Sequence, residues 1–301
     1  MDRGRGKESE GGRRRGEGIR ARVERIGGGE EVLVVSVRGM RGDGITVRRV
    51  IEEVEEEVEG RREEREVVQY ADLSEFFNQL LEADDAESIS GRRYWSERNA
   101  ALSKALRLPF ERRPEAPLFQ PQSISSGFDP DVAAQIEALA HQHRSSPESV
   151  LLACWQVLLC RLTGEREIIV ARSFDTRSYN ELHGVLGPLT RYLPIPISFE
   201  DQDCLSGVLS KLDEAMRAAL AFKDYFSWEQ VAGRKQSADD LAYIPVCFEY
   251  IEWPDRIAGA GTALSLSHLY TCLERYKLRL CCIRRADTLL TEFHFDSSCF
   301  S

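Results

Sequence analysis

Apolar and polar positions alternate along the chain in patterns that predict strands and helices. Residues 31–37 form a short apolar run and predict a buried strand. From Ile45 onward the apolar residues recur at helical spacing with glutamates between them. These apolar positions are Val47, Val50, Ile51, Val54 and Val58. The stretch predicts an amphipathic helix, and its glutamates indicate a solvated face rather than a metal cluster.

Two further helices are expected before a break in the pattern. Helical spacing predicts one over about 73–83 and another over about 94–106. Residues 109–123 then contain four prolines and few periodic apolar residues. This composition predicts an extended linker between two lobes.

The second half of the chain alternates between helical and strand patterns. Asp129-Pro130 and Ser146-Pro147 each combine a capping side chain with a proline at the first helical position, and Gly164 ends the second helix. A further helix surrounds Leu209. Strands are predicted at 167–171, 193–199, 244–251, 278–284 and 288–295, the last two as a hairpin. The order predicts an α/β architecture in two unequal lobes.

Charge and composition divide the chain further. Net charge is −10, yet residues 1–25 hold nine Arg and Lys against five Asp and Glu. This start is rich in glycine and predicts disorder over 1–30. A nucleic-acid-binding tail is the alternative, but no aromatic residue separates the arginines, so we expect no nucleic-acid partner. The expected parts are the start at 1–30, a remnant of a first lobe at 31–108, the linker at 109–123 and a second lobe at 124–301.

Several classes of protein find no support in the sequence. No apolar stretch is long enough to cross a membrane and no signal peptide opens the chain, so a soluble cytoplasmic protein without a membrane partner is expected. The eight cysteines form no CxxC pair and predict buried free thiols. The five histidines are scattered, so we expect no metal site.

Residues 32–44, VLVVSVRGMRGDG, place a short loop between the predicted strand and helix. The loop contains the tripeptide RGD, but adhesion is not expected without a signal peptide or a disulfide framework. The chain has no GxGxxG, GxxxxGK[ST] or GxSxG motif. Pattern and composition alone therefore stop at a two-lobed α/β protein.

A series of short segments in a fixed order is more specific. They are QYAD (69–72), YW (94–95), LP (108–109), SPESVLLACWQVLLCRLTGEREIIVARSFDTR (146–177), GVLGPLTRYLPIPI (184–197), FKDYFSWEQV (222–231), YIPVCFEY (243–250) and FHFDSSCF (293–300). In this order they resemble the condensation domains of non-ribosomal peptide synthetases. The resemblance covers residues 31–301.

This resemblance implies a fold and an activity. The fold is two chloramphenicol-acetyltransferase-like lobes arranged as a V, with the N-terminal lobe incomplete in this chain. The activity is acyl transfer that forms an amide bond between a thioester donor and an aminoacyl acceptor. Peptidyl or acyl carrier proteins present both substrates on 4′-phosphopantetheine arms that enter a tunnel between the lobes. The implied partners are these carriers and neighbouring synthetase domains, and no bound cofactor is implied.

The family's HHxxxDG loop falls on the stretch between the strand and the helix. Asp43 and Gly44 match its DG, while Arg38 and Gly39 occupy the positions of the two histidines. The second histidine acts in the family near the attacking amine, as a base or as an electrostatic aid. The aspartate is structural and pairs with an arginine, for which Arg177 is the candidate here. The resemblance thus predicts a retained scaffold without its proton acceptor.

Other departures from the family concern the tunnel and the extent of the chain. Arg191 and Tyr192 replace Asn-Thr and are candidates for the tunnel wall, and Phe222 replaces a histidine. Several opening elements of the first lobe and a closing helix are also missing, which suggests a fragment, a split protein or a decayed gene. We expect activity to be absent or weak. The alternatives are a non-catalytic module that binds carriers or another partner, a truncated gene product, or a broader HxxxDG acyltransferase.

Overall fold

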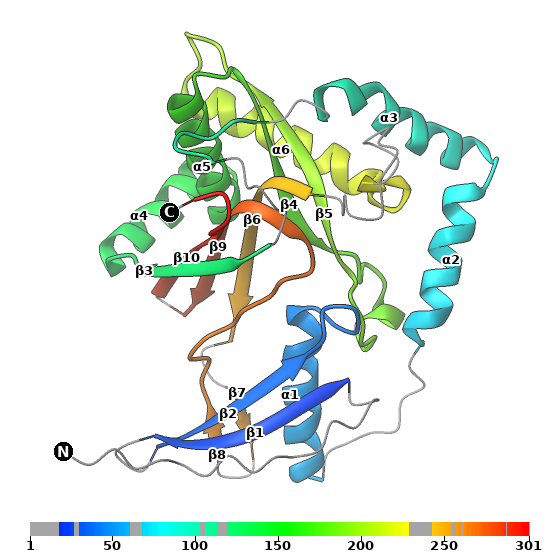
Figure 1. Cartoon of the computed structure of the whole chain (residues 1–301), viewed down its shortest axis with the longest axis vertical. Helices are drawn as coiled ribbons and strands as arrows, with labels where there is room; N and C mark the ends of the chain where they lie inside the picture. Colours follow the sequence, from blue (N-terminus) through cyan, green and yellow to red (C-terminus); the bar gives the residue numbers. More distant parts are fainter. Residues whose placement is uncertain are drawn as a thin grey trace.

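The computed structural model describes residues 18–26, 30–60, 68–102, 106–112, 119–228, 243–254, 257–259, 262–286 and 288–300. Its centre is a six-stranded sheet with the order β3-β10-β9-β6-β4-β5 (Figure 1). The strands are β3 (Pro121–Gly127), β4 (Glu167–Asp175), β5 (Thr190–Ser198), β6 (Tyr243–Trp253), β9 (Arg275–Arg285) and β10 (Thr288–Asp296). Strand β6 runs parallel to β4 and β9, and the other neighbours are antiparallel. The predicted mixed α/β class is confirmed.

Three helices cover one face of this sheet and form the main core with it (Figure 1). They are α4 (Pro130–Gln142), α5 (Pro147–Thr163) and α6 (Leu205–Ala221). The predicted caps of α5 are confirmed: Ser146 accepts a hydrogen bond from Ser149 N–H, and Gly164 ends the helix at a left-handed φ of 73°. Eight of the 17 residues of α5 are buried, which fits its apolar sequence.

The opposite face of the sheet is more polar. Cys247, Arg279 and His294 are direct neighbours across β6, β9 and β10, and all three are buried. One step along the strands, Glu249, Cys281 and Glu292 form a second buried row. The segment 265–274 contacts this face through Thr271, which hydrogen-bonds both Glu249 and Arg279.

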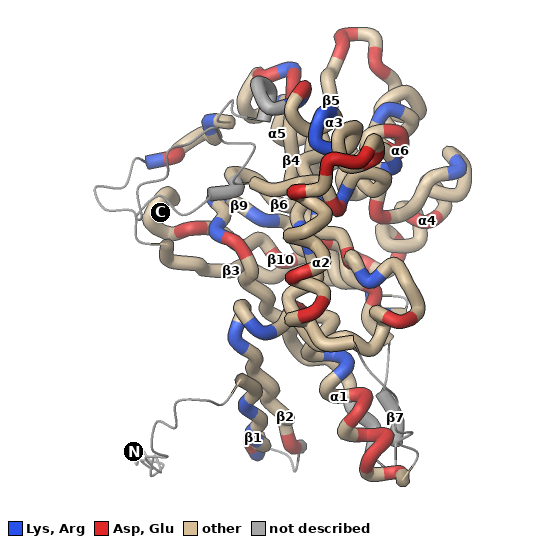
Figure 2. Tube along the Cα trace, turned by 90° about the vertical axis from the view of Figure 1, so that its right-hand side faces the viewer, with Lys and Arg blue, Asp and Glu red and all other residues tan. Residues whose placement is uncertain are grey.

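The elements of the first part of the chain lie beside and below the sheet (Figure 1). β1 (Ile19–Ile26) and β2 (Glu30–Val37) form an antiparallel hairpin, followed by α1 (Gly44–Val58), α2 (Tyr70–Glu82) and α3 (Ala86–Leu102). The short pair β7 (Ile257–Gly259) and β8 (Thr262–Leu264) lies next to α1, although it comes late in the sequence. Acidic residues follow one another along α1 (Figure 2).

The predicted disordered start at 1–30 is wrong for part of its length, because Ile19–Ile26 forms β1. Ile19, Ala21 and Val23 alternate with charged residues, which is the period of a strand. The high content of arginine and glycine hid this alternation. Residues 1–17 and 27–29 lie outside the described residues. β2, which was expected to be buried, is half-exposed because its only described partner strand is β1.

The predicted boundaries between the lobes also need correction. Residues 121–123 of the expected linker are the start of β3, an edge strand that tolerates Pro121 at its first position. Most of the remaining linker, residues 113–118, lies outside the described residues. Trp95 and Leu108, assigned to the first lobe, are buried in the main core with α5 and α6. Apolar burial therefore packs α3 and the segment around Leu108 against the second predicted lobe.

Candidate functional site

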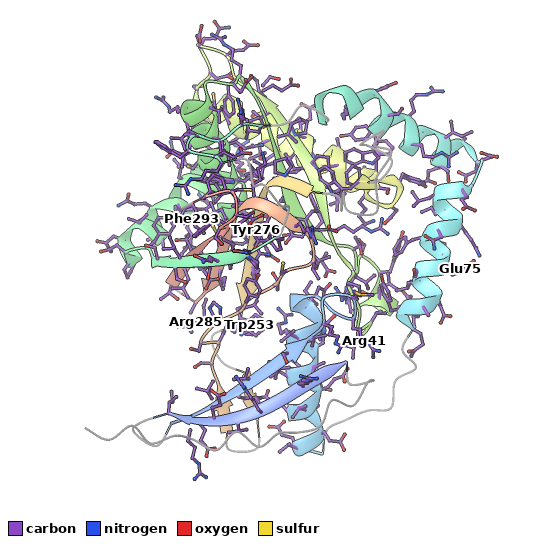
Figure 3. The ribbon with its side chains drawn as sticks, in the orientation of Figure 1. Arg41, Glu75, Trp253, Tyr276, Arg285 and Phe293 are labelled. Carbon is purple, nitrogen blue, oxygen red and sulfur yellow. The ribbon has the colours of Figure 1, made fainter. Side chains whose placement is uncertain are left out.

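The loop between β2 and α1 begins with a tight turn (Arg41 marks it in Figure 3). The carbonyl oxygen of Arg38 accepts hydrogen bonds from the backbone N–H groups of Arg41 at 2.7 Å and of Gly42 at 3.2 Å. Arg38 and Gly39 are exposed, whereas Asp43 is buried. The turn therefore separates Arg38 and Gly39, the two positions that the resemblance assigns to histidines, from Asp43.

Asp43 is the N-cap of α1 and accepts seven hydrogen bonds. Oδ1 accepts from the backbone N–H and the hydroxyl of Thr46 at 2.8 and 2.9 Å. Oδ2 accepts from Leu189 N–H at 3.0 Å and from the N–H and hydroxyl of Thr190 at 2.8 and 2.9 Å. Arg177 donates to both oxygens, at 3.0 and 3.1 Å. The carboxylate thus joins α1 to the start of β5 and to the segment after β4.

Arg177 has every part of its guanidinium occupied. Besides Asp43, Nη1 donates to Asp175 at 3.0 Å, Nη2 donates to the carbonyl of Gly187 at 2.9 Å, and Nε donates to the carbonyl of Val185 at 3.1 Å. The side chains of Arg177 and Asp43 are 1% and 0% exposed. The structure therefore brings together Asp43, Gly44 and Arg177. The two members of the ion pair, Asp43 and Arg177, are 134 residues apart in the sequence.

Electrostatics hold Asp43 in its charged form. Burial by itself raises the pKa of this carboxyl, but the hydrogen bonds and positive charge of Arg177, with further bonds from Thr46, outweigh burial and lower the pKa below 3.8. A buried carboxylate with all its acceptor positions used cannot readily take a proton from a substrate. Asp43 is therefore suited to a structural task.

Gly39 and Gly44 lie against the segment before β9. A Cβ at residue 39 would lie 3.0 Å from the carbonyl oxygen of Cys272, and a Cβ at residue 44 would lie 3.1 Å from Thr271 Cγ2. The backbone of Cys272 thus approaches Gly39, the position that the resemblance assigns to the second histidine. A side chain at residue 39 would fit only if that backbone shifted by a few tenths of an ångström.

The polar face of the sheet adds a buried cluster behind Thr271. Arg279 is 1% exposed, lies 3.5 Å from the Glu249 carboxylate and donates to the hydroxyls of Thr271 at 3.2 Å and Tyr192 at 3.4 Å. Burial raises the pKa of Tyr192, so its hydroxyl stays protonated. Glu249 and Arg279 were not among the residues predicted from the sequence. The sequence did contain a signal for them, because each is a charged residue within an apolar strand pattern: Glu249 in CFEY (247–250) and Arg279 in LRLCC (278–282).

Two histidines share one carboxylate at the β10 side of this face. Glu292 Oε1 lies 3.1 Å from His268 Nδ1, and its Oε2 lies 3.0 Å from His294 Nε2. Burial raises the pKa of Glu292, but the neighbouring imidazoles, His294 first, lower it by more. His294 is fully buried, and its ring lies 5.4 Å from that of Tyr270. Scattering in the sequence concealed this pair, because His294 lies on β10 whereas His268 comes from the segment 265–274, which lies against that strand only in the folded chain.

Arg191 and Tyr192 point to opposite sides of β5, as successive strand residues do. Tyr192 lies on the polar face, whereas the Arg191 guanidinium lies 4.4 Å from the ring centroid of Phe77 in α2. Burial lowers the pKa of Arg191. The two residues predicted for a tunnel wall therefore lie on opposite sides of β5. Phe222 stacks on Tyr94 of α3, with 4.5 Å between ring centroids.

The described residues contain neither a candidate metal site nor a candidate membrane-spanning helix. Within them, no three His, Cys, Asp or Glu side chains are grouped in a way that could hold a metal ion. Among the described helices, none combines the length and the apolar composition that crossing a membrane requires.

Comparison with known proteins gives a consistent family signal. The model of the condensation-domain family matches residues 28–259. One of the plipastatin synthase proteins of Bacillus subtilis (strain 168) is 25% identical over 229 residues, which are 76% of this chain and 6% of that protein. Bacitracin synthase 3 of Bacillus licheniformis is 26% identical over 208 residues, 69% of this chain and 3% of that protein. The chain spans less than a tenth of the length of these curated relatives.

Solved structures agree on the fold. The condensation domain from monacolin K polyketide synthase MokA matches with a TM-score of 0.80 and 20% identity, covering 94% of this chain and 68% of that one. The first condensation domain of the calcium-dependent antibiotic synthetase gives a TM-score of 0.75 at 16% identity, with coverage of 94% and 63%. The X-domain in its complex with OxyB from teicoplanin biosynthesis gives 0.75 at 18%, with coverage of 95% and 66%.

Proposed function

The chain belongs to the condensation-domain family, and we propose that it is a carrier-facing condensation domain whose acyl transfer is absent or very weak. Its fold is the chloramphenicol-acetyltransferase-like fold of that family. In the proposed assignment, Asp43, Gly44 and Arg177 form the retained scaffold of the signature loop. Gly39 marks the position at which a proton acceptor would be needed.

The surroundings of Gly39 are the observation that carries this proposal. In amide formation an aminoacyl amine attacks a thioester carbonyl, the C–N bond forms and the C–S bond breaks. A positioned base assists by accepting the proton that the amine loses, which ends on the departing sulfur. Gly39 has no side chain for that task, and the exposed guanidinium of Arg38 offers N–H donors but no proton acceptor. Loss of a positioned base typically costs about 10²–10⁴ in rate.

The proposed substrates and partners follow from the family. The donor and acceptor groups would be thioesters on the 4′-phosphopantetheine arms of carrier proteins, and neighbouring synthetase domains would supply those carriers. The relatives are synthases of plipastatin and bacitracin, which supports this environment.

A second candidate is a non-catalytic module that binds a partner protein. One fold neighbour, the X-domain from teicoplanin biosynthesis, is known in complex with OxyB, so this fold can serve as a docking partner in that pathway. The close approach of the Cys272 backbone to Gly39 also favours the non-catalytic module, because the loop packs there without room for a reactive side chain.

A single set of assays separates these candidates. The purified chain is mixed with a donor carrier and an acceptor carrier, each loaded with a thioester, and amide product is measured by mass spectrometry while carrier binding is measured by calorimetry. We expect carrier binding with little or no amide product. Arg38→Ala should not increase the amount of product. Product at the rate of an intact condensation domain would contradict the proposal.

The control variants test the scaffold and the lost base separately. Gly39→His should restore product only if the backbone of Cys272 moves enough to make room for the new side chain. Gly39→Ala is the matched control, because it adds the same Cβ without an imidazole. Binding of a protein partner without carrier binding would favour the module. A chain that binds neither and has no cooperative unfolding transition would contradict both candidates and favour a truncated gene product.

A further inference from the structure

The outer strand of the N-terminal hairpin has an open edge. β1 pairs with β2 from Ile19 opposite Val37 to Ile26 opposite Glu30. Among the described residues, no other strand pairs with β1, and all eight of its residues are exposed. An exposed edge of this length is a template for pairing with another strand.

The hairpin register fixes which backbone groups face outward. The backbone N–H of Arg38 donates to the carbonyl of Gly18 at 3.4 Å, so this pair is a hydrogen-bonded one. Hydrogen-bonded and non-hydrogen-bonded pairs alternate in an antiparallel ladder. The N–H and C=O groups of Ile19, Ala21, Val23 and Arg25 therefore point away from β2 and toward the open edge.

The side chains of β1 alternate between two faces, one with Ile19, Ala21 and Val23 followed by Arg25, and one with Arg20, Arg22 and Glu24 followed by Ile26. Ile19, Ala21 and Val23 lie opposite Val37, Val35 and Leu33 on one face of the hairpin. The side of this face formed by β1 is uncovered: Val23 is 62% exposed and Ile19 is 42% exposed. On the other face, Arg22 and Glu24 form an ion pair with 2.9 Å between Nε and Oε1.

We propose that β1 pairs with β1 of a second copy of this chain, antiparallel and with the two-fold axis at Val23. In this register Arg22 lies opposite Glu24 of the second copy, and the same pair forms again across the axis. The four charges then alternate in sign both along and across the strands. The outward N–H and C=O groups of Val23 meet those of its counterpart, which is a hydrogen-bonded pair.

The neighbouring registers are disfavoured by charge. An axis at Arg22 places two arginines directly opposite each other, an axis at Glu24 does the same with two glutamates, and an axis at Ala21 places Arg20 opposite Arg22. Like charges directly opposite each other destabilise a strand pair, whereas opposite charges stabilise it. Pairing of Arg22 with Glu24 therefore selects this register and, as the occupant of the edge, a second copy. On the other face Val23 meets its counterpart, and Arg25 lies opposite Ala21 of the second copy.

Disulfide trapping in the full chain tests the register. In Val23→Cys the two thiols lie on facing residues about 5.5 Å apart at Cα, a separation that a disulfide spans. We expect a covalent dimer on mild oxidation, seen by non-reducing electrophoresis and intact mass. Ile19→Cys is the matched control, because its two copies lie eight residues apart along the strands, roughly 27 Å. The unmodified chain controls for its eight free cysteines.

Charge reversal tests the complementarity without new thiols. Arg22→Glu and Glu24→Arg each place like charges opposite each other, and each should weaken dimerisation roughly tenfold or more in sedimentation equilibrium. The double variant Arg22→Glu/Glu24→Arg restores opposite charges and should recover most of the affinity. Melting followed by circular dichroism verifies that each variant is folded. A monomer at every concentration, equal trapping of Val23→Cys and Ile19→Cys, or a double variant weaker than both single variants would overturn the proposal.

Discussion

At the scale of single residues, the carboxylate of Asp43 is a buried charge that accepts hydrogen bonds from four residues. It is removed from water together with Arg177, and both charges are fully hydrogen-bonded. Desolvation makes such a pair costly to assemble, so its net contribution to stability is modest even with good geometry. Removing one partner is different, because the other charge is then left buried without compensation.

We therefore expect Asp43→Asn to lower the free energy of unfolding by about 3–5 kcal/mol. The amide keeps the size of the side chain but leaves the Arg177 charge unneutralised on that side. Urea unfolding followed by fluorescence measures the change. Asp175→Asn is the matched control, since Asp175 bonds the same Nη1 but its side chain is 41% exposed, and it should cost less than about 1 kcal/mol. Equal effects of the two variants would contradict this role for burial.

The same carboxylate predicts a pH dependence of stability. Its pKa in the folded chain lies below 3.8, the value expected when unfolded, so the unfolded state binds protons first as pH falls. The stabilisation from ionised Asp43 is complete above that value and is lost as pH drops through the folded pKa. Between about pH 5 and pH 2, stability should fall less steeply in Asp43→Asn than in the unmodified chain. Parallel curves in urea titrations would contradict this prediction.

At the scale of elements, local chemistry predicted some boundaries and concealed others. Ser146-Pro147 and Gly164 delimit α5 because capping and left-handed backbone depend on the residue itself. The arginine- and glycine-rich composition of residues 1–30 predicts disorder, whereas the formation of β1 follows the local alternation of Ile19, Ala21 and Val23 with charged residues. The β7–β8 pair was also missed, since two strands of three residues each carry little periodic signal.

Glycines in two helices should respond to alanine in opposite directions. Gly164 ends α5 with φ at 73°, so Gly164→Ala should lower the free energy of unfolding by about 1 kcal/mol. Gly207 lies inside α6, and a Cβ there meets only Cys204 Sγ at an ordinary 3.8 Å. Gly207→Ala should therefore raise stability by roughly 0.5–1 kcal/mol. Thermal unfolding of both variants checks the signs, and a shared sign would contradict the assignment of the two backbone conformations.

At the scale of the whole molecule, contacts between distant segments determine the parts of the fold that local sequence patterns do not predict. The parallel pairing of β6 with β4 and β9 and the packing of Trp95 into the main core join residues far apart in the chain. No local pattern encodes such pairs. The partnership of Asp43 with Arg177 was accessible only through resemblance to a family. The cluster around Arg279 was not accessible, because its members come from three strands and a connecting segment.

One close approach between the two predicted parts of the chain can be tested directly. A Cβ at Gly187 would lie 2.5 Å from Tyr70 Cδ2 at the start of α2, so the ring packs on bare backbone. Gly187 also bonds Thr46 and Arg177, which fixes its position against any shift. Gly187→Ala should therefore overpack this contact and lower the free energy of unfolding by about 1–3 kcal/mol.

Tyr70→Ala removes the ring that Gly187→Ala would strike, so the two changes should be strongly non-additive. In the double variant, adding alanine at Gly187 should cost less than in the unmodified chain by about 1 kcal/mol or more. Gly127→Ala is the control, because a Cβ there meets only Leu290 Cδ2 at 3.8 Å. Additive costs in a double-mutant cycle would mean that α2 does not pack on this segment. Non-additive costs would instead mean that α2 and the Asp43–Arg177 scaffold are energetically coupled through Gly187, which contacts Tyr70 and hydrogen-bonds Arg177.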